Sequence, residues 1–98
     1  MAFQLFLIGY FLIGLLLGNG FPHFLFGSAG KIFRSPFGQK SKPRTNILWG
    51  LSNILLATVI SIGLTILNLY SGYALIALLL GFWLMLLVFG TQIRKFLN

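Results

Sequence analysis

Three long apolar stretches, separated by two short polar connections, dominate the pattern of hydrophobic and polar positions along the chain. They cover residues 5–26, 47–69 and 73–91, and none of them contains Lys, Arg, Asp or Glu. A helix needs about 20 such residues to cross the hydrocarbon core of a bilayer. The pattern therefore predicts an all-α membrane protein with three transmembrane helices in a single membrane domain, residues 1–98.

The two polar connections have different characters. Residues 27–46 form a basic loop, in which Pro36, Gly38 and Pro43 disfavour a continuous helix. The connection between the second and third stretches is so short that it allows only an antiparallel helical hairpin. Residues 92–98 follow the third stretch as a short basic tail.

The distribution of charge predicts the orientation. The chain has seven Lys and Arg and no Asp or Glu, which gives a net charge of +7. These cations lie in the loop and the tail, and three crossings place both segments on one side of the membrane. By the positive-inside rule that side is the cytoplasm, so we expect the N-terminus outside and the C-terminus in the cytoplasm of a bacterial inner membrane.

A cleaved signal peptide is the alternative for the first stretch, since small residues follow it at 27–29. No basic segment precedes the stretch, however, and its apolar run exceeds the usual length of about 7–15 residues. Cleavage would also export the five cations of the loop. We therefore expect a transmembrane helix.

The amino-acid composition excludes several kinds of catalytic and metal site. Only 7% of the residues are charged and 58% are hydrophobic, whereas a soluble domain has about 25% charged residues. Without carboxylate side chains or cysteines, the chain has no carboxylate acid/base pair, all-oxygen metal site or thiol nucleophile. We expect no enzyme, no cofactor and no metal site, and only His23 titrates near neutral pH.

Small and polar residues follow one face of the second predicted helix. They recur at steps of three or four: Asn46, Gly50, Asn53, Ala57, Ser61, Thr65 and Asn68. In the first helix, Gly14 and Gly18 form a G-x-x-x-G pair, which fits a crossing within the chain as well as a dimer. The expected helix-packing residues are Gly14, Gly18, Gly50, Ala57 and Ser61.

Polar residues of the first two helices fall at matching depth near their cytoplasmic ends. We expect a polar pocket formed by Asn19, His23, Asn46 and Asn53, reached by Trp49 and Ser52. Pro22 removes a backbone donor beside His23, so we also expect the first helix to kink or end there. A histidine in this place serves equally well as an interface residue, and the sequence leaves both roles open.

The basic loop mixes cations with aromatic and aliphatic residues, which suits the headgroup layer of an anionic leaflet. Each cation near such a surface gains about 1 kcal/mol. The candidate contacts with anionic lipid are Lys31, Arg34, Lys40, Lys42 and Arg44. Topology alone would require the same charges, and a short tethered loop without a recognisable module does not suggest nucleic-acid binding.

Short motifs in the first half of the chain resemble a group of small, functionally uncharacterised bacterial integral membrane proteins. They are a GNxxPHF motif at residues 18–24, Gly30-Lys31, an SPF motif at residues 35–37, and Asn46-Ile47-Leu48-Trp49-Gly50. The resemblance implies that the polar patch and the loop form one structural unit, and no activity comes with it. The small multidrug transporters share the size but depend on an intramembrane Glu, which this chain lacks.

Three function classes follow. The leading expectation is a non-enzymatic membrane protein that acts by helix assembly, as a homo-oligomer or as an accessory subunit of a larger membrane protein. A small channel or transporter is the second class, and it would favour anions because the chain has no acidic residue. The third class is a protein that binds anionic membrane lipids.

Overall fold

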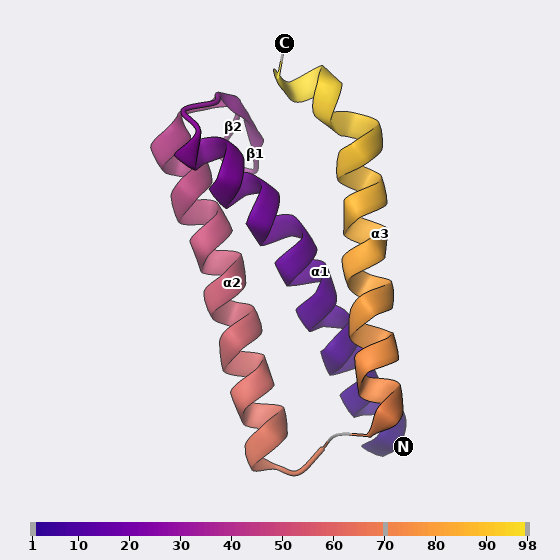
Figure 1. Ribbon diagram of the computed structural model, residues 1–98. Helices are drawn as coiled ribbons and strands as arrows, with labels where there is room; N and C mark the ends of the chain where they lie inside the picture. Colours follow the sequence, from indigo (N-terminus) through magenta and orange to yellow (C-terminus); the bar gives the residue numbers. More distant parts are fainter. Residues whose placement is uncertain (1, 70, 98) are drawn as a thin grey trace.

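The computed structural model describes residues 2–69 and 71–97, which form three long helices and a two-stranded hairpin (Figure 1). The elements are α1 (Ala2–Ser28), β1 (Phe33–Ser35), β2 (Gly38–Ser41), α2 (Pro43–Ile66) and α3 (Gly72–Leu97). All three helices are long and apolar enough to cross a membrane. The predicted three-helix membrane fold is therefore confirmed.

The first helix is longer than predicted. It runs through Pro22 and reaches Ser28, so of the two outcomes expected at the proline an end is wrong, and a kink stays a prediction. A proline inside a helix costs about 3 kcal/mol. Glycines on both sides of Pro22, Gly18 and Gly27, are held in close contact with neighbouring helices, and this packing keeps α1 continuous.

Two helices end in the same hydrogen-bonded motif. After α1, Gly30 adopts a left-handed φ of 77°, and the N–H of Lys31 donates to the carbonyl of Phe26 at 2.9 Å. After α2, Asn68 takes the same role with a φ of 58°, which is why this helix stops three residues before the predicted end.

The other helix boundaries also differ from the predicted ones. The second helix begins at Pro43 rather than at residue 47, because proline is pre-organised for the first helical position. The third helix continues to Leu97, so the predicted tail is mostly helical; the side chains of Arg94 and Lys95 lie outside the described part.

The basic loop contains a small antiparallel hairpin instead of irregular chain. β1 and β2 pair with Ser35 opposite Gly38, around a turn at Pro36 and Phe37. The hydroxyl groups of Ser35 and Ser41 bond to each other inside the hairpin, and the Ser35 hydroxyl accepts a bond from the N–H of Phe37 at 3.1 Å. These bonds give the loop a fixed shape above the ends of the helices.

Helix α1 lies between α2 and α3, which hardly touch each other in the described part of the chain (Figure 1). Its backbone comes very close to that of α3 at Gly14, where a Cβ would overlap the carbonyl oxygen of Leu78. Nearer the hairpin its backbone comes close to that of α2, where a Cβ at Gly20 would lie 2.8 Å from the carbonyl oxygen of Gly50. The central helix contacts both neighbours in each of its halves, and the closest backbone approach shifts from α3 to α2 toward the hairpin.

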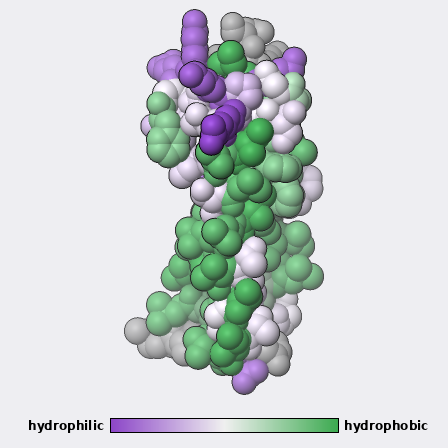
Figure 2. Space-filling model, turned by 90° about the vertical axis from the view of Figure 1, so that its left-hand side faces the viewer, coloured by the Kyte–Doolittle hydropathy of each residue, from purple (hydrophilic) through white to green (hydrophobic). Residues whose placement is uncertain are grey.

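The outer surface matches a bilayer. Figure 2 shows the side on which α2 lies, where hydrophilic residues gather at the hairpin end and hydrophobic residues cover most of the rest. Large apolar side chains such as Leu55 and Val59 of α2 and Leu80 of α3 are more than half exposed. In lipid these side chains need no protein partner.

The crossing of α1 and α3 gives a test of the fold through Gly81. A Cβ there would overlap the carbonyl oxygen of Phe11, so we expect Gly81→Ala to lower the free energy of unfolding by about 1–3 kcal/mol. Gly90 is the matched control in the same helix, because nothing lies within 4 Å of an added Cβ. Reversible unfolding in mixed micelles measures both variants, and equal effects would contradict the crossing.

Candidate functional site

The structure brings the predicted polar residues together as two pairs between α1 and α2. The amide nitrogen of Asn19 donates to Oδ1 of Asn53 at 3.2 Å, and Nδ1 of His23 lies 2.7 Å from Oδ1 of Asn46. The two pairs follow the same order along these antiparallel helices (Figure 1), although Asn19 and His23 are about one turn apart and Asn46 and Asn53 about two turns. Each pair joins residues far apart in the sequence.

Asn46 ties the hairpin to both helices. It is fully buried, and its amide nitrogen donates to the carbonyl oxygens of Ser41 at 3.3 Å and Lys42 at 3.5 Å. Its other side meets His23 of α1. A residue of α2 thus fixes the end of β2 and the ring of a histidine on α1 at the same time, and the polar patch and the loop form one unit, as expected.

A cavity of about 500 Å³ lies beside these pairs, at the hairpin end of the molecule. It is lined from α1 by Asn19 and His23, from α2 by Trp49, from α3 by Met85, Val88 and Phe89, and from the hairpin by Arg34, Ser35, Pro36, Gly38 and Gln39. Its lining is polar on the side of the hairpin and α1 and apolar on the side of α3. Asn46 and Asn53 lie behind the wall.

Aromatic contacts shape two walls of this cavity. The ring of His23 meets that of Phe89 edge-on, with centroids 5.3 Å apart and planes at 81°. Phe37 of the hairpin turn meets Trp49 in the same way at 5.6 Å. Ser52, by contrast, is exposed and bonds to the carbonyl of Leu48 on its own helix, so it does not reach the predicted pocket.

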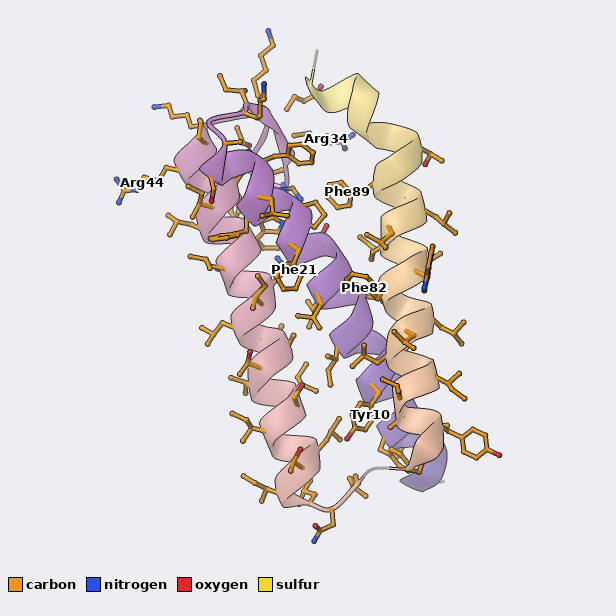
Figure 3. All side chains as sticks on the ribbon, viewed as in Figure 1. Tyr10, Phe21, Arg34, Arg44, Phe82 and Phe89 are labelled. Atoms are coloured by element: carbon orange, nitrogen blue, oxygen red, sulfur yellow. The ribbon has the colours of Figure 1, made fainter. Side chains whose placement is uncertain are left out.

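The five loop cations are all exposed, but they point in different directions. Figure 3 shows Arg34 over the gap between the hairpin and α3, with Phe89 below it, whereas Arg44 points outward on the far side of α2. Of the five, Arg34 lines the cavity. Lys31, Lys40, Lys42 and Arg44 surround the same end of the molecule without lining it.

The predicted packing residues lie in contacts within one chain. Gly14 and Gly18 face α3, and Gly50 faces α1, where an added Cβ would lie 2.6 Å from the carbonyl oxygen of Gly20. Ala57 is 1% exposed, and Ser61 is half-buried with its hydroxyl bonded to the carbonyl of Ala57. The G-x-x-x-G pair therefore serves an intramolecular crossing, and assembly with other chains stays a prediction that needs other faces.

Sequence reasoning missed several residues that build the site. Gly20 and Gly27 are spaced by two turns on the α2 side of α1, a signal the sequence contained. Gly81 and the apolar cavity residues of α3 lie in a leucine-rich helix where no period distinguishes them. The special place of Arg34 among five loop cations depends on the hairpin, which the sequence did not predict.

The amide pair between α1 and α2 offers a test of the site's rigidity. A hydrogen bond between helices in a membrane contributes about 0.6 to 2 kcal/mol. We expect a coupling energy of this size in a double-mutant cycle of Asn19→Leu and Asn53→Leu, measured by reversible unfolding in bicelles. Ser52→Ala is the control, since its hydroxyl bonds within α2. Strictly additive effects of the two substitutions would contradict the pairing.

The chain matches no family model, no curated protein and no solved structure. The resemblance carried by the GNxxPHF and SPF motifs therefore stays a prediction. What the fold and the site establish is a small multi-pass membrane protein of three helices, with a cavity of mixed polarity under a basic hairpin.

Proposed function

We propose that this membrane protein binds an anionic amphiphile, a lipid-like molecule with a phosphate-bearing headgroup, in the cavity under the hairpin. One observation carries the proposal: Arg34 lines a cavity that is also lined by apolar side chains of α3. A charged group and an apolar chain on one ligand would each meet a matching wall. The function is binding, and no catalytic step is part of it.

The polar wall has the donors that a phosphate group needs. A guanidinium group offers paired N–H donors that match the oxygens of a phosphate, and it stays charged at any physiological pH. Gln39 adds a neutral amide on the hairpin side of the same cavity. An anionic headgroup fits this wall better than a cationic one, since the chain has no carboxylate side chain to pair with a cation.

The apolar wall faces the interior of the bilayer. α1 and α3 are in close contact from Gly14 to Gly18 and move apart toward the hairpin end, so the cavity lies where the two helices diverge (Figure 1). Val88 lines the cavity and is 45% exposed, which makes this wall continuous with the lipid-facing surface of α3. A hydrocarbon chain can follow this surface from the cavity into the membrane.

The four other loop cations support the proposal because they attract anionic lipid without lining the cavity. Lys31, Lys40, Lys42 and Arg44 attract anionic headgroups to this end of the molecule, at about 1 kcal/mol each near a charged leaflet. They act on any anionic lipid, whereas Arg34 acts on the one in the cavity. With the N-terminus outside, as the charges predict, the ligand belongs to the cytoplasmic leaflet.

Single arginine substitutions distinguish lipid binding in the cavity from attraction of lipid by the charged surface. In nanodiscs of phosphatidylcholine with a minor share of phosphatidylglycerol, we expect Arg34→Gln to weaken retention of the anionic lipid about fivefold, corresponding to about 1 kcal/mol. Native mass spectrometry of the released protein counts the retained lipids. Arg44→Gln is the matched control and should change retention much less, because its side chain points away from the cavity.

Two outcomes would contradict the proposal. Equal losses in the two variants would mean that the charges act only through the leaflet surface. If the wild-type protein released from these nanodiscs carries no anionic lipid, the cavity does not hold one. Val88→Trp is a further check, since an indole beside the apolar wall should reduce retention while leaving every loop charge in place.

A further inference from the structure

The turn of the hairpin comes back along the helices instead of continuing away from them. The ring of Phe37, in this turn, meets the ring of Trp49 with centroids 5.6 Å apart. Trp49 lies six residues after the start of α2 at Pro43, which is about 9 Å along the helix axis. Because the last cation of α2 is Arg44, the turn reaches the depth of the uncharged, membrane-spanning part of this helix.

The cavity supports the same position of the turn relative to α1. Pro36 and Gly38 of the turn line it together with Asn19. Asn19 lies nine residues before the end of α1 at Ser28, about 13 Å along that helix. The turn therefore lies beside the last turns of the helices, and not only above their ends.

The backbone of this turn is bonded within the hairpin, as a place with little water requires. Pro36 has no N–H group to satisfy. The N–H of Phe37 donates to the Ser35 hydroxyl at 3.1 Å, and the carbonyl of Gly38 accepts from the Ser41 hydroxyl at 2.8 Å. Since Ser41 donates its only hydrogen to Gly38, Ser35 donates to Ser41 in the bond between the two hydroxyls. Polar backbone groups at membrane depth need such partners, whereas a turn in water can leave them to solvent.

The side chain in the middle of the turn is large, apolar and exposed. Phe37 is 70% exposed, and its contact with Trp49 covers only one edge of the pair. Leu48, at the same depth of α2, is 53% exposed, and Leu56, two turns beyond Trp49 on the same face, is 49% exposed. Phe37 thus extends the lipid-facing surface of α2 onto the hairpin.

Cations stand on both sides of this phenyl ring in the sequence. Arg34 lies three residues before Phe37 and Lys40 three residues after it, and both side chains are exposed. An apolar side chain between cations is typical of segments that lie in the membrane interface. The apolar group enters the boundary between headgroups and acyl chains, while the cations meet anionic headgroups.

We infer that the hairpin turn is inserted into the bilayer, with Phe37 at the boundary between the headgroups and the acyl chains of one leaflet. The partner of this surface is the lipid bilayer itself. The inference does not depend on what the cavity holds, because Phe37 contacts lipid on the outside of the hairpin. It fixes the roof of the cavity at the depth of the headgroups, in the leaflet that the charges predict to be cytoplasmic.

Two other surroundings fit Phe37 less well. Water would meet a largely exposed phenyl ring, beside a turn whose backbone groups are already bonded within the hairpin. A second copy of the chain, packed on this surface, would bring together two loops of five cations each. The chain has no carboxylate side chain to balance them, so like charges would oppose this contact.

Spin labels on single cysteines measure the depth of the turn, because the chain has no cysteine of its own. In vesicles of phosphatidylcholine and phosphatidylglycerol, we expect a label at Phe37→Cys to collide more often with oxygen, which dissolves among acyl chains, than with a water-soluble nickel chelate. Leu48→Cys is the matched control at the same depth of α2 and should show the same order. Lys31→Cys, placed after the end of α1, should show the reverse order.

Proton NMR of the unsubstituted protein in nanodiscs of the same lipids excludes an effect of the label or of the lost ring. We expect the signals of the Phe37 ring to broaden with a lipid that carries a nitroxide at the top of its acyl chain. A water-soluble gadolinium chelate should hardly affect them. The amide signal of Lys31 should respond in the opposite way.

The outcomes decide between lipid, water and a second copy. Collisions at residue 37 in the order found for Lys31→Cys, or a Phe37 ring broadened by the gadolinium chelate, would place the turn in water and overturn the inference. Magnetic coupling between labels at residue 37 of two molecules would show a second copy on this surface, and would overturn it too. None of these results changes lipid retention by Arg34→Gln, so the proposed function is tested separately.

Discussion

Backbone contact at glycine is the interaction on which the rest of this structure depends. On one side of α1, α3 packs closely against Gly14 and Gly18. On another side, α2 packs closely against Gly20 and Gly27. In a bilayer, apolar side chains gain little by leaving lipid for protein, so close approach and the dispersion contacts it brings have to hold helices together. The surfaces of α2 and α3 that face lipid contribute little to this association.

The same contacts place the site. Because Gly20 and Gly50 meet without side chains, α1 and α2 come close enough for two amide-based pairs to form between them. Because α1 then leaves α3, a wedge opens at the hairpin end, and the hairpin closes over it (Figure 1). Among the described residues, every buried side-chain nitrogen or oxygen has a hydrogen-bond partner, as buried polar groups require.

The sequence predicted the parts of this fold that depend on the length of an apolar run or on the helical spacing of small and polar residues. The length of the apolar runs was enough for three helices, and the three-to-four spacing from Asn46 to Ala57 identified the buried face of α2. Depth matching then brought His23 and Asn46 together correctly. The hairpin and the α3 wall of the cavity were not predicted, because two serines six residues apart, or a valine in a leucine-rich helix, have no recognisable pattern before the tertiary contacts exist.

Because α1 precedes α3 in the chain with α2 between them, the groove of α1 that receives α3 is synthesised well before the helix that fills it. During synthesis α1 and α2 can pair first through Gly20 and Gly50, and the hairpin between them can close. The wall of the cavity that α3 supplies is synthesised after both of these helices. Until then, the polar wall of α1 faces the bilayer with lipid as its only neighbour on that side.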